Sequence, residues 1–275
     1  MNLVAAAAAE GNTLGAALLG IIQGLTEFLP VSSSGHLVMF QQFFQLGDDH
    51  VLFDLVLHLG TLFVVLWFYR AELIGMFKDV VSGEGPMRSR KGFRTLVLLV
   101  IATIPTGLIG VLFEDLFERW FANPAVLVVT FAITGTVLFV SRWFDQGSGD
   151  EVGMKWWHAV ILGVVQGCAI TPGISRSGST IVAALFLGLD REVAARFSFL
   201  MSVPAILGAV VFKLKDVGAD VVHWPSVGVG ALCALVSGYF SLVLLVRLVR
   251  NGRLSHFSWY CWAAAIAAGV IAWGF

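Results

Sequence analysis

The sequence predicts an all-α integral membrane protein with about six transmembrane helices and two re-entrant helical hairpins, arranged as an inverted-topology repeat. Composition is the first observation: of 275 residues, 58% are hydrophobic and 13% are charged, whereas soluble domains average about 25% charged. The net charge of -1 gives no indication of a nucleic-acid partner. The three cysteines lie in apolar runs without metal-ligand spacing, so we interpret them as small hydrophobic residues.

The lengths of the apolar segments are the second observation. A spanning helix needs roughly 20 apolar residues. Six segments meet this length: 51–69, 93–113, 124–143, 193–213, 226–248 and 256–274. The first residues lack the positive charges of a secretory signal, and no linker separates a second domain. We therefore expect one membrane domain over residues 1–275.

Two further apolar stretches, 13–46 and 157–189, are interrupted by helix breakers. Pro30 divides the first and Pro172 divides the second. Proline removes a backbone donor and clashes with the preceding turn, and the resulting halves of about 15 residues are too short to cross a bilayer alone. We expect a re-entrant hairpin in each stretch; the alternative is one kinked span per stretch.

An internal match is the third observation. Laying position 23 on position 166 aligns Leu19–Gly24 with Leu162–Gly167 without gaps. The same alignment places Ser32, Ser34 and Gly35 on Ser175, Ser177 and Gly178. Repeat 1 then covers about 13–143 and repeat 2 about 157–274. Each half has one hairpin and three spans, and because three is odd, the second copy enters the membrane inverted. Chance similarity between two Gly- and Ser-rich segments is the alternative.

Basic residues indicate the orientation. Six lie between positions 70 and 94: Arg70, Lys78, Arg88, Arg90, Lys91 and Arg94. Positive loops face the cytoplasm, so this segment is expected inside, with both termini and the entrance of the first hairpin outside. Asp48, Asp49 and the Glu114–Arg119 turn are then also outside, and Lys213 and Lys215 are a mild exception.

The first hairpin carries an ionisable cluster, which in an apolar run indicates a functional site. Gln23 and Glu27 are four residues apart on one helical face. His36 follows Ser33 by three residues, and a serine beside a base is typical of an activated nucleophile. Glu27 either orients His36 or binds a divalent metal such as Mg²⁺ or Ca²⁺. The spacing leaves open which serine attacks, or whether His36 itself attacks.

In the second hairpin, Arg176 stands between Ser175 and Ser177 at an expected helix start. A helix N-terminus attracts anions, and the planar guanidinium of arginine matches phosphate oxygens. Two such helix starts meeting near the midplane predict a site for a phosphate or diphosphate. The alternatives are that the serines serve helix packing and that Arg176 and Glu27 only pair. Elsewhere, Asp54 and His58 favour a structural or lipid-headgroup role.

The stretches QGLTE with FLPVSSSGH and PGISRSGST resemble the two signature motifs of the undecaprenyl-pyrophosphate phosphatase family, the bacitracin-resistance type. The resemblance covers the whole chain in length, repeat and motif order. It implies a multi-pass enzyme of the bacterial inner membrane that removes the terminal phosphate from a C55 polyprenyl diphosphate, which recycles the cell-wall carrier lipid. It also implies a divalent metal. The predicted orientation of the first hairpin places the site on the outer side.

The resemblance carries over to single residues. It implies Ser33 as the nucleophile, His36 as acid or base, Glu27 as a metal ligand or partner of His36, and Arg176 as a diphosphate clamp. Further residues at diphosphate-binding positions of the motifs are Ser32, Ser34, Ser175, Ser177, Thr180 and Gly173. Gln23 occupies the family's first Glu/Gln position, and its neutral amide is a weaker metal ligand than a carboxylate.

Two rival functions share these residues. An inverted repeat is a transporter architecture, so a polyprenyl-phosphate flippase that binds the headgroup at the same site is one alternative. A second lipid phosphatase superfamily also uses Ser-Gly-His and Ser-Arg pairs, present here at 34–36 and 175–176. Its downstream histidine motif is missing, which disfavours it. The oligomeric state is not predicted.

Overall fold

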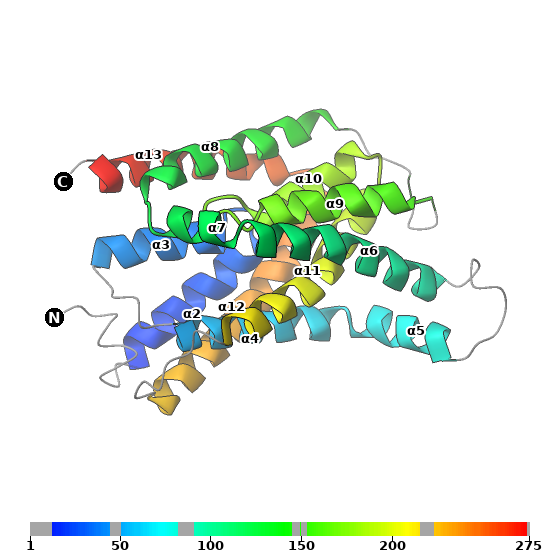
Figure 1. The fold of residues 1–275 in the computed structure, drawn as a ribbon, viewed down its shortest axis with the longest axis horizontal. Coiled ribbons are helices and arrows are strands. Elements are labelled where there is room, and N and C mark those ends of the chain that lie inside the picture. Colours follow the sequence, from blue (N-terminus) through cyan, green and yellow to red (C-terminus); the bar gives the residue numbers. More distant parts are fainter. Residues whose placement is uncertain are drawn as a thin grey trace.

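A computed structural model describes residues 13–44, 51–81, 91–144, 149, 153–214 and 223–273. Within these ranges the chain is helical apart from turns and one isolated bridge between Gly149 and Leu189, which confirms the all-α prediction (Figure 1). The helices are α2 (Thr13–Phe28), α3 (Ser33–Phe44), α4 (Val51–Phe68), α5 (Arg70–Val81), α6 (Lys91–Leu112), α7 (Glu114–Phe121), α8 (Ala125–Val140), α9 (Trp156–Cys168), α10 (Arg176–Phe186), α11 (Arg191–Lys213), α12 (Trp224–Arg250) and α13 (Phe257–Trp273). Short 3-10 turns, η2 (Ser141–Trp143) and η4 (Leu254–His256), follow α8 and precede α13.

All six predicted spans are helices. Five are long and apolar enough to cross a bilayer: Lys91–Leu112, Ala125–Trp143, Arg191–Lys213, Trp224–Arg250 and Leu254–Trp273. The sixth candidate joins α4 to α5 across a bend of 70°. The prediction of about six spans in a membrane protein is therefore confirmed.

Two helices were not predicted. α5 lies in the basic segment expected to be a loop, and it docks there by burying Met76. α7 replaces the expected Glu114–Arg119 turn; it has acidic residues in its first turn and Arg119 in its last, the charge order that a helix dipole favours. The orientation markers Asp48, Asp49, Arg88, Arg90 and Lys215 lie outside the described residues.

The two broken stretches form the helix pairs α2–α3 and α9–α10, with turns at 29–32 and 169–175. In Figure 1 the outer ends of α2 and α3 point to the left, whereas the outer ends of α9 and α10 point to the right. The two turns meet in the interior. This arrangement is compatible with the predicted inverted repeat of hairpins, which stays a prediction.

Aligned glycines bring each hairpin against a spanning helix. α2 packs on α12 and α9 packs on α6. A Cβ on Gly20 would lie 2.2 Å from the backbone oxygen of Gly230, and a Cβ on Gly163 would lie 2.1 Å from that of Ala102. Contacts this close exclude any larger side chain, and small residues commonly permit such approach between membrane helices.

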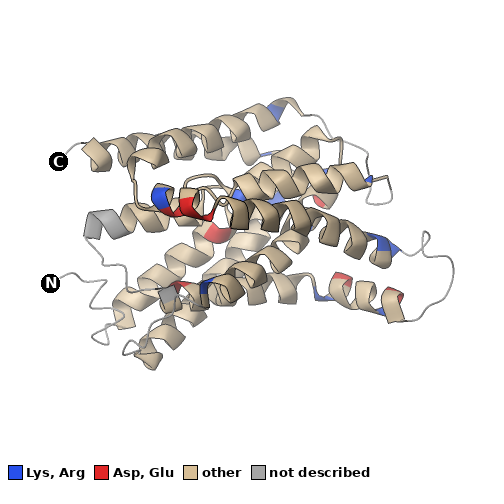
Figure 2. Ribbon diagram, viewed as in Figure 1, with Lys and Arg blue, Asp and Glu red and all other residues tan. Residues whose placement is uncertain are grey.

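Charged residues mostly lie at the ends of the helices, and a few lie in the middle of the molecule (Figure 2). Lys and Arg occur where α5 ends and α6 begins, on the right of the view. Charge inside an apolar bundle is costly and is usually paired and functional. The interior charges therefore direct attention to the point where the two hairpins meet.

Candidate functional site

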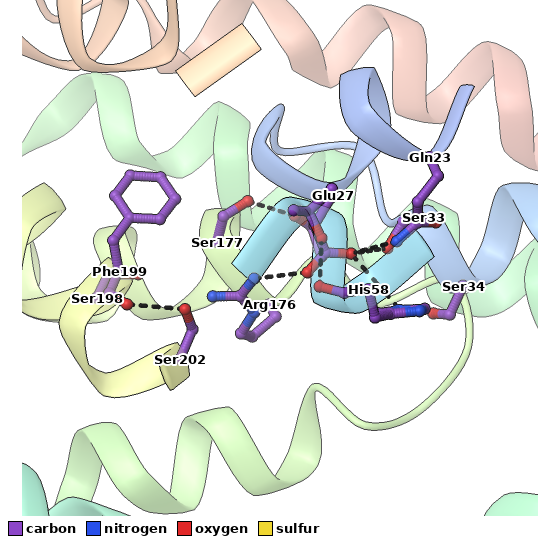
Figure 3. Close-up of polar contacts among 12 residues, drawn as sticks. Gln23, Glu27, Ser33, Ser34, His58, Arg176, Ser177, Ser198, Phe199 and Ser202 are labelled. Atoms are coloured by element: carbon purple, nitrogen blue, oxygen red, sulfur yellow. Dashed lines mark hydrogen bonds and ion pairs between the residues drawn. The ribbon is translucent and has the colours of Figure 1, made fainter. Parts of the chain in front are cut away.

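The carboxylate of Glu27, at the end of α2, is the centre of the interior cluster. Its side chain is 6% exposed. Figure 3 shows side chains from both hairpins and from α4 converging on it. A buried carboxylate is tolerated only when it is paired and hydrogen-bonded, so its contacts define the site.

Each oxygen of Glu27 has its own partners. Oε2 accepts a hydrogen bond of 2.7 Å from the hydroxyl of Ser33 and one of 3.1 Å from the amide of Gln23. Oε1 accepts from Nη2 of Arg176 at 2.8 Å, which is also an ion pair. The structure therefore brings together one predicted residue from each hairpin across 149 positions of sequence, and the Glu27–Arg176 pair is a direct contact.

The turns place these side chains because helices start immediately after them. α3 begins at Ser33 and α10 begins at Arg176. Ser32 accepts a hydrogen bond on its hydroxyl from the backbone N–H of Gly35 at 3.3 Å, and Ser175 accepts one from Gly178 at 3.1 Å. Serine at this position is a favoured N-cap, so the aligned serines start the two helices in the same way.

His36 is not paired with a serine hydroxyl, in contrast to the spacing-based expectation. Its Nδ1 donates to the backbone oxygen of Ser32 at 2.7 Å, and its Nε2 lies 2.7 Å from the hydroxyl of Tyr260. Both ring nitrogens are therefore occupied. The shared helical face predicted from the spacing is right, but the carbonyl one turn back and a tyrosine from α13 take the imidazole away from Ser33.

His58 is the imidazole that does face the cluster, and the sequence argument assigned it elsewhere. Its Nε2 lies 3.8 Å from Oε2 of Glu27, while its Nδ1 donates to the backbone oxygen of Asp54 at 2.8 Å. The available signal was its position as a basic side chain in a mostly apolar helix. Placing α4 beside the first hairpin required the tertiary fold.

The remaining predicted binding residues mostly stabilise the turns. Ser34 and Ser32 share a hydroxyl contact of 3.3 Å, as do Ser177 and Ser175. Thr180 donates to the backbone oxygen of Arg176 at 2.7 Å or pairs with Ser198 at 2.5 Å. The backbone oxygen of Gly173 accepts from Thr134 at 2.7 Å. Their contact with a diphosphate stays a prediction.

Two buried polar atoms at the cluster find no hydrogen-bond partner among the described residues: Nη1 of Arg176 and Oε1 of Gln23. Burying an unpaired polar atom is unfavourable, so each points to a bound group. A free guanidinium nitrogen suits an anion, and a free amide oxygen suits a hard cation.

This donor set also tests the fit of a divalent metal. The described residues contain no group of three or more His, Cys, Asp or Glu side chains that could hold an ion by themselves. Magnesium, however, is commonly held by one or two protein oxygens together with substrate phosphates and water. Glu27 with the free oxygen of Gln23 fits that mode of binding.

Comparison with known proteins assigns the family. Residues 16–267 match the family model described as bacitracin resistance protein BacA. The chain belongs to this family. It is 44% identical over 262 residues to an undecaprenyl-diphosphatase of Alkaliphilus metalliredigens, covering 91% of this chain and 95% of that relative. An undecaprenyl-diphosphatase of Methanobrevibacter smithii is 43% identical, covering 91% and 94%.

A third relative, the undecaprenyl-diphosphatase of Halothermothrix orenii, is 42% identical and covers 92% of this chain and 96% of its own. The family match, over residues 16–267, includes both sequence motifs. The family named from the two sequence motifs is therefore confirmed.

Proposed function

We propose that this chain is an undecaprenyl-diphosphatase, which hydrolyses a C55 polyprenyl diphosphate to the monophosphate and inorganic phosphate. One observation carries the proposal beyond the family relationship. The hydroxyl of Ser33 is hydrogen-bonded to a buried carboxylate that also holds a guanidinium with one free, buried N–H group. A nucleophile, a base and an anion clamp thus lie within one cluster.

The geometry suggests the order of events. Oγ of Ser33 attacks the terminal phosphorus, its proton passes to Oε2 of Glu27, and the anhydride P–O bond breaks to release polyprenyl phosphate. Water then hydrolyses the phosphoserine and the proton returns to the serine. Arg176 stabilises the charge on the phosphoryl oxygens, since positioning and charge stabilisation are most of what a protein supplies to phosphoryl transfer.

This proposal gives the base role to Glu27. The hydrogen bond of 2.7 Å between Ser33 and Glu27 is within the reach that proton transfer requires. The role of acid or base that the family resemblance implies for His36 has no comparable contact in the structure, because its two ring nitrogens are bound to Ser32 and Tyr260.

A divalent cation, Mg²⁺ or Ca²⁺, is proposed at Glu27 and Gln23. When bound, it would neutralise charge on the substrate diphosphate. Support comes from the unpaired amide oxygen of Gln23 beside the carboxylate and from the preference of these ions for oxygen ligands.

The substrate is proposed to enter from the outer side of the bacterial inner membrane, with its tail among the spanning helices. The first hairpin, which carries Ser33 and Glu27, opens at the end of the molecule opposite the α5–α6 junction (Figure 1). That junction carries Lys78, Lys91 and Arg94, and positive segments mark the cytoplasmic side.

Phosphate release by the purified chain from a short polyprenyl diphosphate tests the proposal. Ser33→Ala should lower turnover by at least about a thousandfold, which corresponds to the loss of an attacking group. The control is Thr136→Ala on α8, whose exposed hydroxyl bonds to Ala132 of its own helix and which should retain activity. A fully active Ser33→Ala would refute the assigned nucleophile, and chelator should stop the reaction if the cation is required.

The flippase alternative is tested in the same preparation. If the wild-type chain releases no phosphate yet moves polyprenyl phosphate across liposomes, the same cluster binds a headgroup without chemistry and the enzyme proposal fails.

A further inference from the structure

Ser32 has a backbone conformation that side-chain-bearing residues rarely adopt. Its φ is +67°, and among the described residues it is the single non-glycine with a positive φ. This left-handed region crowds Cβ against the backbone, so the conformation persists only where surrounding contacts enforce it. Ser32 directly precedes Ser33, and its conformation therefore sets the direction of the Ser33 side chain.

The backbone oxygen of Ser32 is held by His36. The backbone oxygen of Ser32 accepts from Nδ1 of His36 at 2.7 Å and from the backbone N–H of the same residue at 3.2 Å. A carbonyl oxygen only accepts, so Nδ1 carries the proton and Nε2 of the neutral ring has the lone pair. Nε2 therefore accepts the hydrogen bond of 2.7 Å from the hydroxyl of Tyr260.

Two aromatic rings from other helices, Phe131 of α8 and Tyr260 of α13, contact the imidazole ring. Tyr260 stacks on His36 with centroids 5.6 Å apart and an interplanar angle of 13°, and Phe131 meets it edge-on at 5.4 Å. Cys261, next to Tyr260, donates from Sγ to the backbone oxygen of Pro30 at 3.6 Å. Neighbouring residues of α13 thus contact the first turn directly at Pro30 and α3 at His36, which is itself bonded to Ser32 of that turn.

We propose that Tyr260 is a positioning residue for the phosphatase reaction. Through His36 it holds the left-handed backbone of Ser32, and that backbone aims the hydroxyl of Ser33 at Glu27. This inference rests on the proposed function, in which Ser33 attacks. α13 supplies no group to the Glu27 cluster. Under this proposal it nevertheless influences the rate at which Ser33 attacks.

Tyr260→Phe tests the proposal because it removes the hydroxyl and keeps the ring. We expect kcat for phosphate release to fall about tenfold, the effect of about one hydrogen bond, with KM changed less than about twofold. Tyr239→Phe on α12 is the matched control, since Tyr239 is 41% exposed and Tyr260 is 49% exposed; it should leave both constants unchanged. A Tyr260→Phe enzyme with wild-type kcat would overturn the proposal.

Rescue distinguishes positioning from general destabilisation. Glycine adopts a positive φ without penalty. In a Ser32→Gly background the turn therefore no longer needs the link from Tyr260 through His36, which we call the tether. There, Tyr260→Phe should lower kcat less than about twofold relative to Ser32→Gly alone. An equal tenfold loss in both backgrounds contradicts the proposed route through Ser32.

A spectroscopic readout separates this inference from the proposed function. In chain labelled with ¹⁵N-histidine, the His36 signals, assigned by their loss in His36→Gln, should show protonated Nδ1, and Tyr260→Phe should shift Nε2. If wild type releases no phosphate, the proposed function fails while this measurement still reads the tether. Unchanged Nε2 in Tyr260→Phe would show that the tether does not exist.

Discussion

The turns of the two hairpins begin aligned helices but are held differently. In the first turn the positive φ falls on Ser32, at +67°; in the second it falls on Gly173, at +86°, and the N-cap Ser175 has an ordinary φ of -74°. α13 contacts the first turn directly through Cys261 and indirectly through the bond from Tyr260 to His36, and α8 contacts the second turn through Thr134.

The two turns therefore maintain their backbone conformations in different ways. The second turn, which presents Arg176, uses a glycine that adopts its conformation without strain. The first turn, which presents Ser33, uses a strained serine that depends on partners from elsewhere in the chain. The hairpin with the proposed nucleophile therefore depends on a distant helix for a strained conformation. The hairpin with Arg176 has contacts from Thr134 of α8, but its glycine needs no partner to adopt a positive φ.

Among the changes that test this contrast between the turns, the largest effect is expected from removing the guanidinium of Arg176. Arg176→Ala should lower kcat/KM about a thousandfold, near the upper end of what one preorganised donor contributes. Arg176→Lys keeps the charge but loses the planar fork and should recover only part of this activity. The measurement is steady-state phosphate release, with Arg250→Ala as the control, because Arg250 forms an exposed ion pair with Glu192.

If Arg176→Lys is fully active, a point charge suffices and the planar fork of the guanidinium is not required. If Arg176→Ala retains most activity, the second hairpin supplies no group that catalysis needs. The division of roles between the two hairpins is then wrong.

Gly173→Ala tests whether the second turn depends on its glycine. A Cβ there would lie 2.0 Å from Oγ1 of Thr130 at a φ of +86°, so we expect a loss of about 3 kcal/mol in unfolding free energy from left-handed strain and overpacking together. Gly188 has a φ of +83° with open space around its Cβ position. Gly188→Ala should therefore lose only about 1–2 kcal/mol.

Unfolding of both variants in detergent, followed by circular dichroism, measures the difference. Equal losses would mean that the contact with Thr130 relaxes freely and that only the backbone conformation matters.

The sequence predicted the helices well because a bilayer imposes length and apolarity on each span. It also predicted the two turns, since Pro30 and Pro172 break helices by covalent chemistry alone. It missed α5 and α7, whose stability depends on docking against neighbours more than on an unbroken apolar run.

Within the site, local spacing succeeded for Gln23 and Glu27, which bond at i and i+4, and for the two helix starts, which lie at Ser33 and Arg176. It failed for His36 and His58. Both lie on the expected helices, but which imidazole faces Glu27 depends on how α4 and α13 pack around the first hairpin. Periodicity along one chain segment does not contain that information.

A smaller effect is expected at the contact between α8 and the second turn. Thr134 donates to the backbone oxygen of Gly173 and accepts from the N–H of Ser175 at 3.1 Å. Thr134→Val leaves both buried groups unpaired, which should cost about 2 kcal/mol of unfolding free energy. Thr136 is exposed and bonds to Ala132 of its own helix, so Thr136→Val should cost less than about 0.5 kcal/mol.

A Thr134→Val variant as stable as Thr136→Val would mean that Gly173 alone fixes the second turn. The contrast between the turns would then be sharper than proposed.

The smallest effect is expected at the second contact of α13 with the first turn. The thiol of Cys261 is a weak donor to Pro30, so Cys261→Ala should lower kcat about twofold, or about 0.4 kcal/mol of activation free energy. Cys261→Ser keeps a donor at the same place and should retain wild-type kcat, and Cys168→Ala at an exposed cysteine is the control.

If Cys261→Ala instead matches the loss expected for Tyr260→Phe, α13 acts on the first turn as a packed surface, and the route through His36 has no special part. A twofold loss in Cys261→Ala beside a tenfold loss in Tyr260→Phe would instead separate the two contacts. Only the Tyr260 contact leads, through His36, to the backbone of Ser32 with its positive φ.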